Sequence, residues 1–121
     1  MTLEIVPADP RVVEVVLDTV IDMPAVAFVG IDGEKFAGSG GLAWGNGRCW
    51  LWFMTVEPKP EYARPVLNMA RRLLRKAKQF GESEVYTIRD PQFDTSPRLL
   101  ALTGFKFHAV EDGNEVFRCA I

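Results

Sequence analysis

The stretch from residue 48 to residue 88 decides the fold, and most of it reads RCWLWFMTV (48–56), EPKPEYAR (57–64) and PVLNMARRLLRKAKQF (65–80). The first part is apolar on both faces, which predicts a central strand that is covered on both sides. Pro65 fits the first position of a helix. Apolar residues then recur at helical spacing, namely Val66, Leu67, Ala70, Leu73, Leu74 and Ala77.

This helix is predicted to end at Gly81, after several basic residues that suit the negative end of a helix dipole. Glu84–Ile88 then predicts another strand. Because a helical crossover joins the strand over 48–56 to the strand over 84–88, we expect the two to pair in parallel.

Two strands upstream of residue 48 predict an antiparallel meander. Ala25–Ile31 and Lys35–Trp44 are separated by the turn signal Asp32-Gly33, and Asn46-Gly47 gives a second turn. The second strand contains three glycines, which indicate a bulge or a close approach to the backbone: Gly38, Gly40 and Gly41.

The two ends of the chain complete the element order. Leu3–Val6 predicts a strand, and a helix follows from Asp9-Pro10 to Met23-Pro24. Near the other end, a short helix is capped by Thr95 or Ser96 and stops before Gly104, and a hairpin has strands over 105–110 and 115–121. We therefore predict one α+β domain over residues 1–121, with a mixed, mostly antiparallel sheet flanked by helices.

Composition excludes several classes of protein. The chain has 121 residues, 48% of them hydrophobic, and a net charge of −2, which suits a single globular domain and argues against a nucleic-acid binder. No apolar run is long enough to span a membrane and no signal peptide is visible, so we expect a cytoplasmic protein. Cys49 and Cys119 are expected to be reduced and buried, and the single histidine argues against a metal site.

Basic residues are concentrated in one segment. Residues 59–78 hold seven of the fourteen Lys and Arg residues, opposed there only by Glu61. This pattern has two interpretations that the sequence leaves open. It is either a solvated helix face or a site for a phosphorylated ligand or another polyanion.

The order of elements and three motifs resemble the GCN5-related N-acetyltransferase (GNAT) family, in a small form that is similar to phage or prophage members. Met54-Thr55-Val56-Glu57-Pro58 resembles the exit of the family's fourth strand. Asn68–Leu74 lies where the family has the Gly-x-Gly/Ala-x-x-Leu-Leu opening of its long helix, and Leu99–Phe105 is similar to the family's closing segment.

The resemblance implies acetyl-CoA as the cofactor. Backbone groups of Met54, Thr55 and Val56 would bind the pantetheine arm and polarise the thioester carbonyl. The start of the long helix would bind the pyrophosphate, through backbone N–H groups of Val66, Leu67 and Asn68 and the side chains of Arg64 and Arg71.

The chain departs from the family pattern at three positions. Pro65 and Asn68 stand at motif positions of the phosphate loop, and Leu100 stands where the family has its general-acid tyrosine. Pro65 lacks an N–H, and Leu100 cannot donate a proton. The loop, counted from Pro58, is also about four residues longer than is usual in the family.

Catalytic residues are less defined than the cofactor segment. Glu57 and Asp90 follow the two central strands and are the candidate general bases, although both also suit solvated loop ends. Tyr86 and His108 are expected to be structural, Tyr62 is either a ligand contact or an exposed loop residue, and neither cysteine is expected to act as a nucleophile.

Two functions follow from the resemblance. One is an N-acetyltransferase that transfers an acetyl group from acetyl-CoA to an unknown amine by direct attack on the thioester. The alternative is a catalytically inactive module that binds CoA or serves as a structural or interaction protein, virion-associated if phage-encoded. In this second case Trp50 and Trp52, which share a strand face, would form a homo-oligomer contact.

Overall fold

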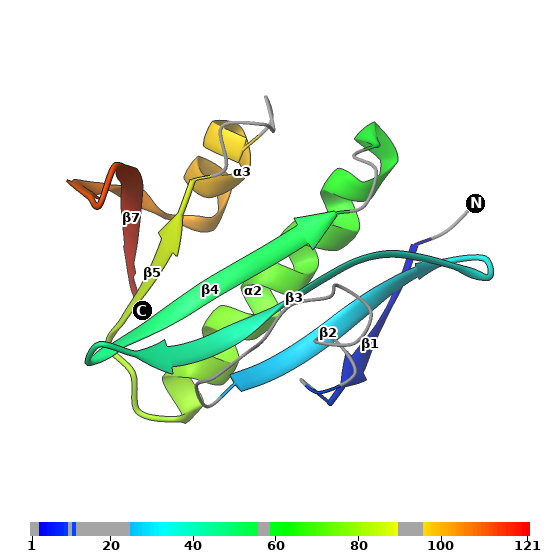
Figure 1. Ribbon diagram of the computed structural model, residues 1–121, viewed down its shortest axis with the longest axis horizontal. Coiled ribbons are helices and arrows are strands. Elements are labelled where there is room, and N and C mark those ends of the chain that lie inside the picture. The colour runs from blue at the N-terminus through cyan, green and yellow to red at the C-terminus, as the bar shows by residue number, and fades with distance from the viewer. Residues whose placement is uncertain (1–2, 10, 12–24, 56–58, 90–95) are drawn as a thin grey trace.

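The computed structural model describes residues 3–9, 11, 25–55, 59–89 and 96–121, which form one mixed sheet and two α-helices (Figure 1). The predicted helix after Asp9-Pro10 lies outside the described residues, except for Arg11. The elements are β1 (Leu3–Ala8), β2 (Ala25–Asp32), β3 (Lys35–Gly45), β4 (Arg48–Thr55), the 3₁₀ turn η1 (Pro60–Tyr62), α2 (Ala63–Gln79), β5 (Glu84–Ile88), α3 (Ser96–Thr103), β6 (Lys106–Glu111) and β7 (Asn114–Ala120).

The seven strands lie in the order β1-β2-β3-β4-β5-β7-β6. Every neighbouring pair is antiparallel except β4 and β5, so the predicted meander and the predicted parallel pair are both confirmed. The parallel pair is short, because its ladder consists of Trp50 opposite Tyr86. Beyond that pair the two strands run apart toward their C-terminal ends (Figure 1).

The hairpin turns follow the glycine and asparagine signals. Asn46 and Gly47 have φ of 56° and 71°, and Asp112 and Gly113 have φ of 52° and 79°, as two-residue hairpin turns require. The predicted Asp32-Gly33 turn is wrong by one residue. Asp32 still pairs with Lys35 inside the β2–β3 ladder, which places the turn at Gly33 and Glu34.

The glycines of β3 mark both a bulge and a close approach. Gly38 pairs with Gly30 and Phe36 pairs with Ile31, which leaves Ala37 as an extra residue in β3. A Cβ at Gly41 would collide with the main-chain carbonyl oxygen of Val26. A Cβ at Gly40 would lie 2.5 Å from the terminal methyl group of Met69 on α2.

Helix α2 supplies most of the helical side of the core. It starts at Ala63 rather than at the predicted Pro65, because η1 already winds the chain into the helix direction. Pro65 is tolerated because the first helical turn needs no N–H there. Gly81, with φ of 92°, ends the helix, and the N–H of Glu82 donates to the Ala77 carbonyl at 3.0 Å, as in a Schellman cap.

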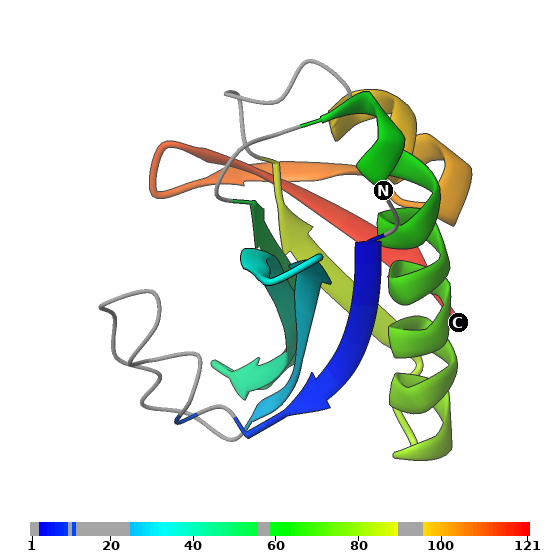
Figure 2. The same ribbon diagram turned by 90° about the vertical axis from the view of Figure 1, so that its right-hand side faces the viewer.

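Both described helices cover the same face of the sheet (Figure 2). The core lies between this face and the helices and is formed by Phe28, Leu42, Cys49, Leu51, Met69, Ala70, Leu73, Leu74, Ala77, Val85, Leu100, Phe105 and Cys119. Because side chains alternate along a strand, Cys49 and Leu51 on the helix-covered face put Trp50 and Trp52 on the opposite one. We call this opposite face, with Trp50, Trp52 and Tyr86, the tryptophan face.

The packing of β3 predicts different costs for two neighbouring glycine-to-alanine substitutions. We expect Gly41→Ala to lower the free energy of unfolding by about 3 kcal/mol or more, because the new Cβ meets rigid backbone. We expect Gly40→Ala to cost about 1 kcal/mol, because the end of a flexible methionine can move away. Urea unfolding of both variants measures the difference, and equal losses would contradict the close approach.

Candidate functional site

The divergence of β4 and β5 creates the most unusual backbone arrangement in the sheet. Next to the single Trp50–Tyr86 pair, the buried hydroxyl of Thr87 donates to the carbonyl oxygen of Leu51 at 2.8 Å. A side chain of β5 therefore occupies the place of a backbone donor in the ladder. From Trp52 onward, β4 has no further ladder pair with β5 among the described residues, which leaves its edge available to another hydrogen-bonding partner.

The predicted cofactor segment lies at this edge. Met54 and Thr55 end β4 and pair with Ser39 and Gly38 on its other side, so β3 holds their backbone in place. Val56 lies outside the described residues, and so do the two candidate bases, Glu57 and Asp90.

The start of α2 bears on which backbone N–H groups could bind a phosphate. Since the helix begins at Ala63, the N–H groups of Val66, Leu67 and Asn68 fall within it and lie in position to bond carbonyl oxygens four residues back. Pro65 has no N–H, and the N–H of Ala63 donates to the Pro60 carbonyl. Val66, Leu67 and Asn68 therefore lie inside the first turns of α2, and their contact with the pyrophosphate stays a prediction.

The basic residues of α2 divide into two groups. Arg72 and Lys76 lie over the ring of Phe28, with 5.3 Å and 6.0 Å from their charged ends to the ring centre, so they cover the core edge. The other four, Arg64, Arg71, Arg75 and Lys78, are exposed, as is Arg72 itself. Part of the basic segment is thus structural, and Arg64 and Arg71 stay accessible to an anion.

A buried hydrogen bond fixes the turn that leads into α2. The Tyr62 hydroxyl donates to Oδ2 of Asp32 at 2.7 Å, and the two residues are 6% and 7% exposed. This contact ties η1 to the end of β2, 30 positions away in the sequence. The other carboxylate oxygen of Asp32 has no hydrogen-bond partner among the described residues. The sequence predicts either a ligand contact or an exposed loop residue for Tyr62 and a turn residue for Asp32, whereas both side chains are buried partners.

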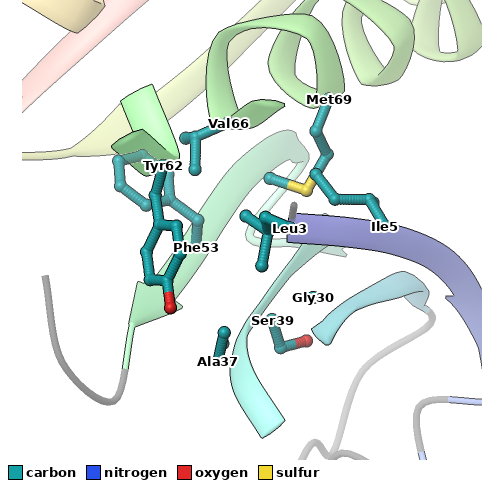
Figure 3. Close-up of a pocket in the computed structure, with 10 residues that line it drawn as sticks. Leu3, Ile5, Gly30, Ala37, Ser39, Phe53, Tyr62, Val66 and Met69 are labelled. Atoms are coloured by element: carbon teal, nitrogen blue, oxygen red, sulfur yellow. The ribbon is translucent and has the colours of Figure 1, made fainter. Parts of the chain in front are cut away.

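A small cavity lies beside this contact, between the first turns of α2 and the sheet (Figure 3). Its volume is about 20 Å³, and its walls include Leu3, Ile5, Phe53, Val66 and Met69. The nearby Ser39 hydroxyl donates to the Phe28 carbonyl at 2.7 Å. A space of this size admits about one water molecule, and its walls are almost entirely apolar.

A second group of side chains meets on the tryptophan face. Arg48 donates two hydrogen bonds to Glu111, at 2.6 Å and 3.1 Å, and its guanidinium lies 4.3 Å from the centre of the Tyr86 ring. His108 makes an edge-to-face contact with Tyr86, with ring centres 5.5 Å apart. The Tyr86 hydroxyl donates to Glu84 at 2.9 Å. We call these residues, with Trp50, the aromatic-ion cluster.

The Arg48–Glu111 contact shifts the pKa values of both partners. Its hydrogen bonds hold the pKa of Arg48 above its ordinary value and the pKa of Glu111 below its ordinary value, so both groups stay charged near neutral pH. The sequence does not predict this pair, because its members are 63 positions apart. The only local signal was alternation along β4 and β5, which places Arg48, Trp50, Glu84 and Tyr86 on one face.

Several other candidates have structural roles. Leu100, at the family's tyrosine position, is 3% exposed in the core, so no proton donor stands there. Trp44 donates to Glu82 at 3.0 Å and packs edge-on against Phe80, so it fastens β3 to the end of α2. The described residues contain no cluster of potential metal ligands and no helix long and apolar enough to cross a membrane.

The overall structure is similar to solved acetyltransferases. A putative acyl-CoA N-acyltransferase from Klebsiella pneumoniae has a TM-score of 0.71 at 11% identity, with 98% of this chain and 97% of that chain covered. A Bacillus subtilis acetyltransferase in complex with CoA has a TM-score of 0.66 at 13% identity, with 99% of each chain covered.

A GNAT family acetyltransferase from Elizabethkingia anophelis with acetyl-CoA bound has a TM-score of 0.64 at 12% identity, with 98% of each chain covered. No protein-family model and no curated protein matches this chain. Identities this low establish the fold alone. The chain therefore has the fold of the GCN5-related acetyltransferases, as its motifs predicted.

Removal of the buried Tyr62 hydroxyl tests the anchor of α2. We expect Tyr62→Phe to lower the free energy of unfolding by about 1–3 kcal/mol, because Asp32 would lose its hydrogen-bond donor inside the protein. Asp32→Asn is the matched control, since its amide oxygen can still accept from Tyr62 and the loss should be smaller. Chemical denaturation measures both, and a Tyr62→Phe loss below about 0.5 kcal/mol would contradict the anchor.

Burial of the two cysteines predicts that their thiols react slowly with reagents while the protein is folded. Burial raises the pKa of the Cys49 thiol to about 11 and also raises the pKa of Cys119. At pH 8 the Cys49 thiolate fraction is then about 0.1%, so we expect a disulfide reagent to label either cysteine only as the protein unfolds. Rapid labelling of folded protein at pH 8 would contradict this.

Proposed function

We propose that this protein binds acetyl-CoA at the divergence of β4 and β5 and transfers the acetyl group to an amine. The observation that carries the proposal is the single Trp50–Tyr86 ladder pair, which leaves the end of β4 without a strand partner on that side. Solved proteins of the same fold include complexes with CoA and with acetyl-CoA, which supports a thioester ligand for this edge.

The residues around the edge fit such a ligand. The backbone of Met54, Thr55 and Val56 would hydrogen-bond the pantetheine arm in place of a neighbouring strand. Arg64 and Arg71 would contact the phosphates through charge-assisted hydrogen bonds. In this arrangement Val66, Leu67 and Asn68 contribute the surface of the helix start rather than free N–H groups, and the Tyr62–Asp32 bond keeps that start in place.

The chemistry requires little covalent participation by the protein. When bound, acetyl-CoA supplies the acyl group as a thioester. The amine nitrogen attacks the carbonyl carbon, the C–N bond forms, and the C–S bond breaks to release the thiolate. A base must take the proton from the amine, and Glu57 and Asp90 stay the candidates for this role. Cys49 is too buried, and its pKa too high, to serve as a covalent nucleophile.

A non-catalytic role is the second candidate, and Leu100 is the observation that favours it. Its side chain packs in the core where the family has an acid, so the departing thiolate would take its proton from water or from another group. Pro65 removes one further donor from the phosphate region. Under this alternative the protein binds CoA without turnover, or acts as an interaction module through Trp50 and Trp52.

A thermal-shift titration with acetyl-CoA, CoA and ATP tests the cofactor. We expect both CoA ligands to stabilise the protein by about 2.7 kcal/mol at one hundred times the dissociation constant, and ATP to have little effect. Arg64→Ala and Arg71→Ala should each weaken CoA binding by about three- to tenfold, because each loses an exposed charge-assisted contact. Arg75→Ala is the matched control on the same helix.

Two outcomes separate the candidates. If acetyl-CoA releases CoA in the presence of an amine, as measured by titration of the free thiol, the result supports acetyltransferase activity. Stabilisation by CoA without any turnover across an amine panel supports the non-catalytic module. The absence of any thermal shift with millimolar CoA would contradict a CoA site of either kind.

A further inference from the structure

We infer that the outer face of α2 is a docking surface for the phosphate backbone of a nucleic-acid duplex, which it binds without reading the bases. This inference is independent of the proposed acetyl transfer. It is carried by a line of positive charge along the helix and by the separation of acidic and basic residues on the surface. We call this line the cation stripe, and its members are Arg64, Asn68, Arg71, Arg75 and Lys78.

The cation stripe follows one side of α2. Successive members are three or four residues apart, so at about 100° per residue all of them fall within a sector of about 80°. All are exposed, whereas Leu73 on the opposite side of the helix is fully buried. Figure 2 shows α2 beside the sheet, so the stripe faces away from the strands. At 1.5 Å per residue the stripe is about 21 Å long.

No acidic residue of the helix neutralises the stripe. The sequence of α2 contains no Asp or Glu, and no ion pair among the described residues involves a cation of α2. Like charges three or four residues apart destabilise a helix, and Arg71, Arg75 and Lys78 have this spacing. A face that served only solubility would mix acidic and basic residues. The stripe instead has a cost in helix stability that an anionic partner would remove.

The net charge of −2 is an average over two unlike parts of the surface. The exposed acidic residues of the described chain lie outside α2, in or next to β1, in the β2–β3 turn, in η1 and in the β6–β7 turn: Glu4, Asp9, Glu34, Glu61 and Asp112. They form no line that matches the stripe, so a second copy of this chain is a poor complement. Their repulsion also confines a polyanion to α2, which limits its footprint to one helix.

The composition of the stripe favours phosphates over a protein surface. It contains no apolar residue, whereas the centre of a protein–protein interface buries apolar and aromatic side chains. A phosphate backbone needs no apolar contact, because its binding is driven by the release of condensed counterions. Three of the four cations are arginines, whose planar guanidinium group matches phosphate oxygens.

A duplex fits the stripe better than a single strand does. Proteins that bind single strands stack the bases on aromatic side chains, and the stripe has no aromatic residue. Each strand of a duplex has one phosphate per about 3.4 Å of axis, so a stripe of about 21 Å runs along about six phosphates. The four cations then contact the backbone alone, and binding does not depend on base sequence.

The test measures the binding of a fluorescein-labelled DNA duplex of about 20 base pairs by fluorescence anisotropy, between about 50 and 200 mM NaCl. Four phosphate contacts predict a slope of about −3.6 for log K against log salt, which is an affinity loss of about 150-fold over this range. Two duplexes of unrelated sequence should bind within about twofold of each other. A slope shallower than about −2, or a sequence preference above about tenfold, would overturn the assignment.

Variants of the stripe separate its contribution from general electrostatic attraction. Arg75→Ala and Lys78→Ala keep a good helix former and should each reduce the slope by about 0.9 and weaken binding by about three- to tenfold. Arg75→Lys keeps the charge and should keep the slope. Lys106→Ala, which removes an exposed cation from β6, is the matched control and should change neither slope nor affinity. Equal effects of Lys106→Ala and Lys78→Ala would overturn the role of the stripe.

Two competing probes decide between partner classes. Polyglutamate represents an acidic protein segment, and single-stranded DNA represents an unpaired strand. We expect each to bind at least about tenfold more weakly than the duplex at the same salt concentration. Tighter binding of polyglutamate would replace the nucleic acid with a protein partner and so overturn the inference. Arg75→Ala and Lys78→Ala should leave the affinity for CoA unchanged, so failure of the duplex site and failure of the proposed acetyl transfer are distinguishable.

Discussion

The parallel pairing of β4 with β5 is the constraint on which the rest of the structure depends. Helix α2 makes the crossover, and its buried stripe holds both strands against the core, with Leu73 and Ala77 fully buried. Each buried leucine of this stripe contributes about 1.5–3 kcal/mol through removal from water. The pairing is nevertheless limited to one ladder pair, so packing rather than backbone hydrogen bonding holds the strands at this point. The proposed site lies in this gap.

Two polar contacts determine what surrounds the gap. On the side of α2, Tyr62 and Asp32 fix the turn from which the helix starts, so that its exposed arginines have a defined position. On the tryptophan face, Arg48 and Glu111 bring the β6–β7 hairpin beside Trp50 and Tyr86. The first contact is buried and rigid, whereas the second is partly exposed. The contact on the side of α2 is therefore the more rigid of the two.

Much of the fold could be predicted from local patterns. The helix stripe over Val66–Ala77, the alternation in the strands and the turn residues Asn46-Gly47 each specify their element without distant partners. Errors arose at element ends, where context decides. The turn after β2 moved by one residue because Asp32 still pairs with Lys35, and α2 started two residues early because η1 extends it.

Only those parts of the candidate site whose residues come from one continuous segment could be predicted. Short-range periodicity and backbone φ preferences encode the order of strands and helices, the glycine positions of β3 and the basic surface of α2, so these features could be read from the sequence. The contact of Tyr62 with Asp32 and the cluster of Arg48, Tyr86, His108 and Glu111 can be seen only in the folded chain. The contacts that join different elements link residues 22 to 63 positions apart, and these residues meet because the sheet order, a β-bulge and the reach of one hairpin place them together.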